Sequence, residues 1–586
     1  MTHILLRRGG LLGIATLALF VWLAPSHVVD GDNSEFSTLS VTGGTAHPSG
    51  YPLFVLWLRA MSWLPGASPA HTAAIATAIL AAVSILILHA ACRAWGARPL
   101  AATIACAVFA GGPIVLRTYT EAEVFALNGV VVATVLWLAA EQGPLRGARR
   151  AIALGLIAGL GLSNHMTCAL LAPVGLLGVV RGVREASRAS RSGVAVIGAT
   201  VLAVLAGLTP YAYLLAAPDT PLSWGKVHDV EELIAMVLRQ DYGGPGAFRS
   251  TGPEVSPWTS IASLGTDMAR GWLWVPLTAG LVTFGWRIVR PKAPEDRWGW
   301  SMLATSLLLA GPVLVSRFNV PPEGLGLYVC RRFYLLPMLL AAIPISVAIS
   351  ELGDLLERRI GSRRAVLASV VASTLGLAVV AATSLPAISV VHGPAVENSA
   401  HNLLGSLPKD AVVIASQDEL HAATGYVQTA LGVRQDVTIV TWTIMTLDWY
   451  RARMAKRGIV AAPGPGSPLV RVVATLLAKG RPVFVDRLQT EVIASFPTHP
   501  YGIVIRVLPP GAPMPSVPEV FTINQQLYAA FVLDEPQPGP DDEYATVVHR
   551  RYAGIWQMIG TALAREGKHE DAAWSFETAR QLGPRP

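Results

Sequence analysis

Charged side chains and cysteines are both scarce in this sequence. Asp, Glu, Lys and Arg make up 14% of its 586 residues, whereas soluble domains average about 25%. Apolar residues make up 52%, which excludes a disordered chain and argues against an ordinary soluble enzyme. The four cysteines lie far apart, mostly inside apolar runs, and form no CxxC pair. Neither a disulfide framework nor a zinc site is therefore predicted.

The basic residues do not indicate a nucleic-acid partner. The net charge is +7, and the arginines cluster in short gaps between long apolar runs. Membrane proteins place basic residues in such gaps on the cytoplasmic side. We therefore expect a lipid bilayer around the chain and no nucleic acid.

The apolar runs are long enough to cross a bilayer, which takes about 20 mostly apolar residues. We expect a polytopic α-helical membrane protein with about 11 transmembrane helices. This count treats 151–181 as a helical hairpin that crosses the membrane twice, with its tip at Ser163–His165. A single crossing there would put the Arg181–Arg191 cluster outside. The predicted spans lie near residues 9–27, 70–92, 99–117, 122–140, 151–163, 166–181, 193–217, 270–289, 299–316, 333–350 and 364–387.

The first span follows Arg7 and Arg8, and no small-x-small cleavage site follows Pro25. We interpret it as a retained span with a cytoplasmic N-terminus, not as a signal peptide. An odd number of crossings then puts the C-terminus outside. The expected location is the cell membrane, as a multi-pass protein of a bacterial inner membrane with an extracytoplasmic C-terminal domain.

The last third of the chain has a soluble pattern. Strands are predicted at 411–415 and 437–440 with a helix at 419–432 between them, a βαβ arrangement. Further strands are predicted near 482–485 and 502–508, and the helical spacing of 551–582 resembles one tetratricopeptide (TPR) unit. We therefore expect three regions: a transmembrane domain at 1–390, an extracytoplasmic α/β domain at 391–545 and a TPR-like helical cap at 546–586.

Carboxylates gather just beyond the first span, in loop 28–50. Asp30, Asp32 and Glu35 are followed by His47 and Tyr51 in a His-Pro-Ser-Gly-Tyr-Pro element. A carboxylate at a membrane interface is costly to desolvate, so its presence there indicates a functional site. A solvated loop with Pro and Gly turns is the alternative, and composition alone does not separate the two.

Other outer gaps carry further candidates. Glu121 and Glu123 precede Asn128, which lies one turn into the next span. Thr120 and Glu123 also fit a helix capping box, which is compatible with a functional carboxylate. His165 lies at the expected hairpin tip, where a structural role is the commoner one for a lone histidine.

Arginines and aromatics mark the remaining outer gaps. Arg331 and Arg332 lie outside, against the charge pattern of the other gaps, and the planar guanidinium suits phosphate recognition. Snorkelling of these side chains toward lipid head groups is the alternative. Trp224, in the long gap 218–269, suits sugar stacking or simple packing on the membrane surface.

Two motifs resemble a known family. Gly31–Phe36 and Ala46–Leu53 are similar to the opening of the multi-pass membrane family called domain of unknown function 2723, which includes an animal endoplasmic-reticulum protein O-mannosyltransferase. The family's Asp-x-Gly-Glu stands here as Asp32-Asn33-Ser34-Glu35, without the glycine. The resemblance covers roughly the first 390 residues, and its further matches in order are Ala122–Asn128, Leu162–His165, Trp224-Gly225, Tyr242-Gly243 and Arg332–Tyr334.

The resemblance implies a membrane glycosyltransferase of the GT-C type. Its donor would be a polyprenyl-phosphate sugar and its acceptor a protein or glycan hydroxyl. Asp32 matches the family's catalytic carboxylate and is expected to be the general base, with Glu35 orienting it or the acceptor. No metal ligand or cofactor is assigned, and a divalent metal is left open. The expected substrate-binding residues are His47, Tyr51, Glu123, Asn128, His165, Trp224, Arg331 and Arg332.

Two other functions remain as alternatives. A multi-pass transporter or lipid flippase predicts ionisable residues in mid-span and a repeat between halves, and the sequence shows neither. A non-catalytic membrane scaffold leaves the acidic loop without a role. The sequence does not specify the sugar, for which mannose is one candidate.

Overall fold

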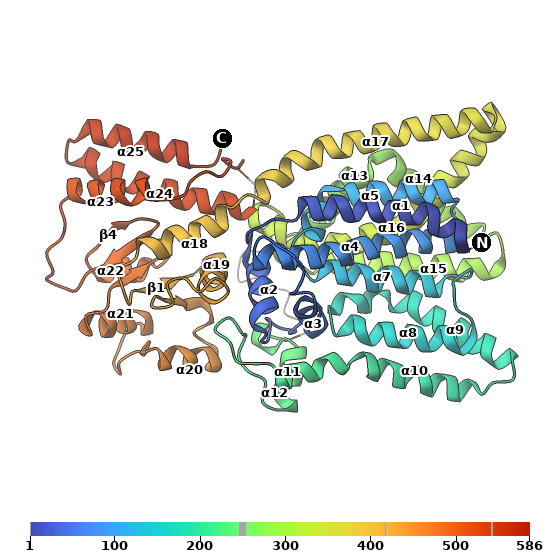
Figure 1. Cartoon of the computed structure of the whole chain (residues 1–586), viewed down its shortest axis with the longest axis horizontal. Coiled ribbons are helices and arrows are strands. Elements are labelled where there is room, and N and C mark those ends of the chain that lie inside the picture. The colour runs from blue at the N-terminus through green and yellow to red at the C-terminus, as the bar shows by residue number, and fades with distance from the viewer. Residues whose placement is uncertain (1, 245–253, 417, 541–542) are drawn as a thin grey trace.

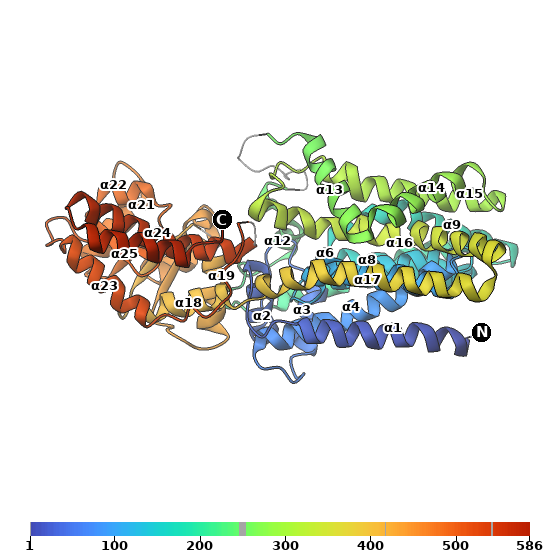
Figure 2. The same ribbon diagram turned by 90° about the horizontal axis from the view of Figure 1, so that it is seen from above.

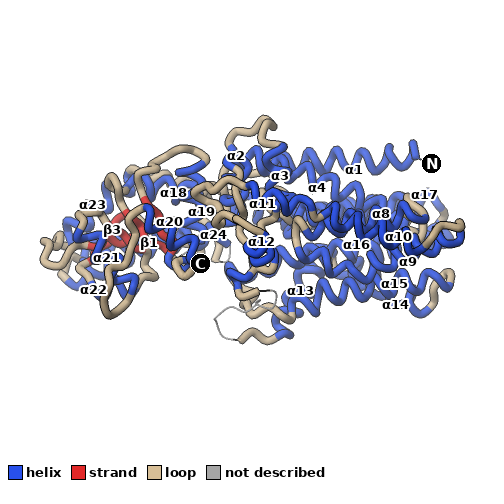
Figure 3. The backbone as a smooth tube through the Cα atoms, turned by 90° about the horizontal axis from the view of Figure 1, so that it is seen from below, coloured by secondary structure: helices blue, strands red, loops and turns tan. Residues whose placement is uncertain are grey.

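A computed structural model describes residues 2–244, 254–416, 418–540 and 543–586. The chain has two parts, which lie end to end in Figure 1. Helices α1–α17 form an elongated bundle, with the N-terminus at its far end. Five strands and helices α18–α25 form a second unit beyond the other end, and Figure 3 shows the sheet confined to this unit.

The bundle contains the predicted apolar runs as helices. Its α-helices are α1 (Thr2–Leu23), α2 (Gly31–Thr42), α3 (Pro52–Ala60), α4 (Pro69–Ala94), α5 (Pro99–Gly111), α6 (Pro113–Tyr119), α7 (Phe125–Ala139), α8 (Gly147–Leu162), α9 (Ala172–Arg188), α10 (Gly193–Gly207), α11 (Ala212–Ala216), α12 (Val230–Val237), α13 (Pro257–Trp272), α14 (Trp274–Val289), α15 (Pro294–Leu308), α16 (Gly324–Ile360) and α17 (Ser362–Val391). Shorter helical segments are η1 (Met166–Leu171), η2 (Thr209–Tyr211), η3 (Gln240–Tyr242) and η4 (Leu309–Val313).

The mostly helical, membrane-type fold is confirmed. In the described part of the chain, five helices are long and apolar enough to cross a bilayer, or up to seven if each of two bent pairs is one span. The count of about eleven crossings therefore stays a prediction. The bent pairs are α5 with α6, at 69°, and α13 with α14, at 109°.

Proline explains the first of these bends. Pro113 begins α6 directly after Gly112, and proline has no N–H with which to continue the hydrogen bonds of the preceding helix. The α6 helix then leads into the turn that carries Glu123. The break thus brings a polar turn to the end of the bundle that faces the second unit.

The two ends of the bundle differ in character. Helices α2, α3, α11 and α12 lie at the end next to the second unit, whereas the connections α9–α10, α14–α15 and α16–α17 lie at the opposite end (Figures 1 and 2). At the opposite end, Arg93, Arg181 and Arg287 line one cavity of about 340 Å³. Arginines from gaps far apart in the sequence are thus gathered at one end, as the charge pattern predicts.

The second unit is built on a five-stranded sheet with the order β2-β1-β3-β5-β4. Strand β1 pairs in parallel with β2 and β3, and β5 pairs antiparallel with β3 and β4. The strands are β1 (Val412–Ala415), β2 (Thr438–Thr441), β3 (Val483–Val485), β4 (Thr498–Tyr501) and β5 (Val504–Val507). The helical segments are α18 (Ala395–Ser406), α19 (Asp418–Thr429), η5 (Trp442–Ile444), α20 (Asp448–Lys456), α21 (Pro468–Ala478), α22 (Thr490–Ser495), α23 (Val517–Ala529), α24 (Glu543–Arg565) and α25 (His569–Leu582).

Helices cover both faces of this sheet because successive strand residues point to opposite sides. Val412 and Ile414 pack with side chains of α20 to α25, whereas Val413 packs with those of α18, α19 and the start of α24. Helices α24 and α25 also pack on each other, with the Trp556 and Trp574 rings 5.0 Å apart. The likeness of this pair to a TPR unit stays a prediction.

Specific contacts join the two parts. The Val28 N–H donates to Glu397 at 2.8 Å, and the buried Arg117 forms a 2.8 Å ion pair with Glu543 at the start of α24. Val28 and Ala70 of the bundle also lie within the apolar cluster of α18 and α19. The second unit therefore rests directly on loop 28–50 and the start of α4.

Candidate active site

Segments distant in sequence converge where the bundle meets the second unit. They are α2 and the loop after it, the turn between α6 and α7, the tip of the α8–η1 hairpin, the α12–η3 segment and the start of α16. Most of the sequence-predicted residues lie here.

Loop 28–50, expected to be irregular, contains helix α2. Asp30 is its N-cap and accepts a 2.7 Å hydrogen bond from the Asn33 N–H. The Asp30 carboxylate is fully buried, accepts a 2.7 Å hydrogen bond from the Tyr328 hydroxyl and lies 3.4 Å from Arg117. These contacts leave Asp30 fully engaged in holding α2, and Asp32 follows in the first turn, where the helix dipole favours negative charge.

Asp32 and Glu123 share one arginine. Arg332 forms an ion pair with Asp32, and its Nη1 also donates a hydrogen bond to the Glu123 carboxyl at 3.0 Å. Its guanidinium lies 4.6 Å from the centroid of the Tyr328 ring. The Asp32 side chain is 32% exposed, whereas that of Glu123 is 2% exposed, so Asp32 is the more accessible carboxylate of the two.

The surroundings separate the pKa values of these carboxylates. Burial disfavours ionisation of Asp32, but attraction by Arg332 and His47 outweighs it and lowers the Asp32 pKa. Burial raises the pKa of Glu123 to about 8, with repulsion from Asp32 and Asp30 opposing the attraction of Arg332. Asp32 is therefore ionised at neutral pH, while Glu123 is largely protonated.

Glu35 orients His47. The two Glu35 oxygens contact the His47 N–H at 2.9 Å and its Nδ1 at 2.5 Å. Burial opposes protonation of His47, but Glu35 and Asp32 together raise its pKa to about 9. His47 is thus a cation at neutral pH, and it stabilises the ionised form of Asp32 by electrostatic attraction.

An aromatic and amide layer lies beside this pair. Tyr51 packs between His47 and His165, with ring centroids 5.0 and 5.8 Å apart. His165 contacts Thr167 at 2.7 Å, and the Asn128 amide donates to the same hydroxyl at 3.2 Å. Burial lowers the pKa of His165 to about 3, so this ring is neutral. The Asn128 Oδ1 is buried without a hydrogen-bond partner among the described residues.

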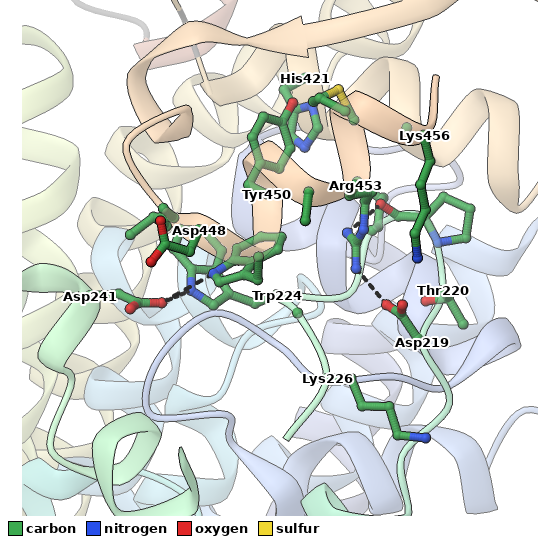
Figure 4. A pocket seen from close by; sticks show the side chains of 18 of the residues that line it. Asp219, Thr220, Trp224, Lys226, Asp241, His421, Asp448, Tyr450, Arg453 and Lys456 are labelled. Carbon is green, nitrogen blue, oxygen red and sulfur yellow. Dashed lines mark hydrogen bonds and ion pairs between the residues drawn. The ribbon is translucent and has the colours of Figure 1, made fainter. Parts of the chain in front are cut away.

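The structure does not bring Arg331 and Trp224 into this cluster. Arg331 and Arg332 both lie within α16, and adjacent residues of a helix point about 100° apart. Arg332 therefore faces the cluster, whereas Arg331 points elsewhere and pairs with Asp267 at 2.9 Å. The Trp224 indole donates to Asp241 at 2.7 Å, at the edge of a neighbouring cavity (Figure 4).

Sequence reasoning missed Tyr328 and Arg239. Tyr328 links Asp30 to Arg332, as described above. Arg239 precedes η3, lies 5.2 Å from the Tyr242 ring and acts electrostatically on Asp32 and His47. Arg239 lies in a gap that the sequence predicts to be outer, so the reasoning that singled out Arg332 would also have found it.

The donor set does not favour a metal site. Across the described ranges, no three His, Cys, Asp or Glu side chains are placed to hold a metal ion. Asp32 and Glu123 instead have Arg332 as a positive partner supplied by the chain.

The chain is similar to proteins of one named family. Residues 32–188 match the model described as the Protein O-mannosyl-transferase TMEM260 N-terminal domain. The chain is 24% identical over 467 residues to Protein O-mannosyl-transferase TMEM260 of Mus musculus, covering 77% of this chain and 64% of that protein. It is 20% identical over 471 residues to Protein O-mannosyl-transferase tmem260 of Dictyostelium discoideum, covering 72% and 56%. It thus spans less than two thirds of the length of these curated relatives.

A solved structure shares the fold. ArnT from Cupriavidus metallidurans, in the apo state, superposes with a TM-score of 0.50 at 13% identity, covering 86% of this chain and 99% of that one. This likeness shows a shared fold and no more. The segment matched by the O-mannosyl-transferase domain begins at Asp32, within the motif that carried the resemblance, and the resemblance to this family is therefore confirmed.

Proposed function

We propose that the chain is a membrane glycosyltransferase that moves a sugar from a polyprenyl-phosphate-linked donor to an acceptor hydroxyl on the outer face of the membrane. The observation that carries this proposal is the cluster of ionised Asp32, shared Arg332 and cationic His47 at the polar end of an apolar bundle. The names of the curated relatives favour mannose as the sugar and a protein as the acceptor.

Three cations suit the donor phosphate. Arg332, His47 and Arg239 each attract the ionised Asp32 carboxylate and lower its pKa. A lipid-linked sugar phosphate is amphiphilic, so its tail needs apolar helices while its phosphate stays at their polar end. Preorganised cations at that end stabilise the phosphate as it gains charge in the transition state.

Asp32 is the general base of the proposed reaction. The acceptor oxygen forms a bond to the anomeric carbon, and its proton passes to Asp32. The bond between the anomeric carbon and the phosphate oxygen breaks, and the phosphate leaves with the bonding electrons. A donor phosphate that draws Arg332 toward itself frees the Asp32 carboxylate for this proton. General-base catalysis of this kind is worth about 10²–10⁴ in rate.

The other residues position these groups. Glu35 holds the ring of His47, and Glu123 holds the same Nη1 of Arg332 that contacts Asp32. Tyr51 and His165 form the wall beside His47.

The test is transfer by the purified full chain in nanodiscs. Polyprenyl-phosphate-mannose with a labelled sugar is supplied together with a membrane-protein fraction as acceptor. We expect label on protein, with release of polyprenyl phosphate. Transfer from GDP-mannose without lipid-linked donor would contradict the donor assignment, and movement of the lipid across the bilayer without transfer would favour a flippase.

A further inference from the structure

A cavity lies at the basic end of the bundle, opposite the catalytic cluster. Its volume is about 340 Å³, within the range of about 300–1,000 Å³ that is usual for sites of small ligands. Its walls come from the ends of α4 and α14, the start of α15, the residues after α7 and the second half of α9 (Figures 1 and 2). Helices distant in sequence thus close around a space that the proposed transfer does not use.

Basic side chains outnumber acidic ones in this cavity. Arg181 pairs with Glu141 at 3.1 Å, and Arg287 pairs with Glu351, which does not line the cavity. Even with Glu351 counted, positive charge is in excess among the described residues. The lining contains four cations, Arg93, Arg181, Arg287 and Lys292, and two carboxylates, Glu141 and Asp296.

Burial sets Arg287 apart from the arginines that only mark the cytoplasmic side. Arg188 and Arg358, at the same end of the bundle, are exposed to solvent, as the charge rule alone allows. Arg287 is only 5% exposed. Burial of a guanidinium is costly unless its N–H groups are paired, so this position indicates a partner in addition to Glu351.

Two hydrogen-bond donors of the lining are unused. The Nε of Arg93 and the Nε of Arg287 are buried with no hydrogen-bond partner among the described residues. A guanidinium has N–H donors and no acceptor, so the partner that these atoms lack is an acceptor. The planar fork of arginine matches the oxygens of a phosphate group.

Tryptophans flank the cavity on its way to the bilayer. Trp95 and Trp300 line it, with their ring centroids 5.5 Å apart. Trp286 of α14 and Trp298 of α15 are exposed at the same end of the bundle. Exposed tryptophans at the end of membrane helices lie at the level of the lipid head groups. This setting favours a phosphate that is carried by a lipid.

We infer that this cavity binds the phosphate group of an anionic membrane lipid, at a site separate from that of the lipid-linked donor. The inference goes beyond the proposed transfer and does not depend on it. A phosphate that accepts hydrogen bonds from Arg93 and Arg287 joins the ends of α4 and α14. Its binding should therefore also raise the unfolding temperature of the chain.

The test measures lipid binding by the full chain, purified in a neutral detergent. Phosphatidylglycerol and phosphatidylcholine are titrated separately, with native mass spectrometry reporting the first bound lipid and thermal unfolding as a second readout. We expect phosphatidylglycerol to bind at least about tenfold more tightly and to raise the unfolding temperature more. Arg287→Gln should lose most of this preference. Lys292→Gln should weaken it without disturbing the fold, because Lys292 is exposed.

The double variant Arg358→Gln with Arg359→Gln is the matched control. Both arginines are exposed at the same end of the bundle, and neither lines the cavity, so this variant should bind like the parent. Equal affinity for the two lipids, a preference that survives both Arg287→Gln and Lys292→Gln, or an equal loss in the control would each overturn the inference. Displacement of phosphatidylglycerol by an equal concentration of inorganic phosphate would overturn it too, because the ligand would then be free phosphate.

Discussion

Asp32 and Glu123 are neighbouring carboxyl groups whose pKa values move in opposite directions, and the pKa of His47 beside them rises. The pKa of Asp32 is lowered, that of His47 is raised to about 9, and that of Glu123 is raised to about 8. Groups separated in this way can serve as base, cation and neutral hydrogen-bond partner at a single pH. Each role depends on a named neighbour, so each can be tested by changing that neighbour.

Changing Glu35 to Gln should shift the pH dependence of donor binding. In the parent, the protonated His47 attracts the donor phosphate, so this contribution is present below about pH 9 and is lost as the pH rises through the His47 pKa. Without the Glu35 charge, burial and Arg239 lower that pKa, and the loss occurs at a lower pH. We expect donor affinity to fall about tenfold at slightly alkaline pH, the equivalent of one charge-assisted hydrogen bond.

The measurement is donor binding across a pH series in nanodiscs. Glu232→Gln is the control, because Glu232 contacts the exposed His228 at 2.9 Å in a comparable pair outside the catalytic cluster. Identical pH profiles for the parent and Glu35→Gln would refute the role of His47.

Arg332→Ala should weaken donor binding by about tenfold or more, and more than it weakens acceptor binding. Arg332 lies between Asp32 and Glu123, whereas Arg331 is paired with Asp267. Arg331→Ala should therefore have the smaller effect. The measurement is titration of both variants with the lipid-linked donor. If Arg332→Ala binds the donor as tightly as the parent does, Arg332 does not contact the phosphate, and snorkelling toward lipid head groups is the better interpretation.

The sequence identified most of the cluster but not its internal pairing. Asp32, Glu123 and Arg332 come from segments far apart in the chain, and family motifs together with charges in outer gaps marked all three. Which of Arg331 and Arg332 faces the site depends on the rotation of α16, which begins at Gly324, earlier than the apolar pattern indicates. Tyr328 lies in the same unforeseen turns of this helix.

At the scale of elements, α2 positions the base. Asp30 caps the helix, and Tyr328 and Arg117 hold the same carboxylate from α16 and α6. The helix itself was not predicted because α2 is rich in Ser and Thr and lacks an amphipathic period. Its conformation depends on the cap and on burial by the second unit, neither of which is visible in a local pattern.

Asp30→Asn and Asp30→Ala should separate capping from catalysis. Asn caps helices about as well as Asp, whereas Ala costs about 1 kcal/mol at an N-cap and removes the oxygen that Tyr328 and Arg117 contact in Asp30. We expect Asp30→Asn to keep most of its transfer activity and Asp30→Ala to unfold at a clearly lower temperature. Thermal unfolding and transfer assays on both variants provide the check, and equal melting temperatures would contradict the capping role.

At the scale of the whole molecule, the site lies where the helical bundle and the second unit meet. Hydropathy predicted the helical bundle, and short apolar runs predicted strands β1, β2, β3 and β5 of the second unit but not β4. The contact between the parts was not predictable, because it depends on single side chains such as Arg117 and Glu543, more than 400 residues apart in sequence. The polar end of the bundle also carries the second unit, so both are expected on the same side of the membrane.

Reporter fusions should show this sidedness. A reporter fused after residue 390 should be active only outside the cytoplasm, and one fused within 186–190 should report the cytoplasm, because the basic residues lie at that end of the bundle. An exterior signal from the fusion within 186–190 would refute the hairpin at 151–181, and with it the placement of His165 in the site.

The most direct measurement is sugar transfer by Asp32→Asn. The substitution keeps size and hydrogen bonding but removes the base, so transfer from the lipid-linked donor should fall by about 10² or more while expression and donor binding are retained. Asp30→Asn, measured in the same nanodisc assay, should be much milder. Full activity in both variants would contradict the account, because the first outer loop would then not be the catalytic centre.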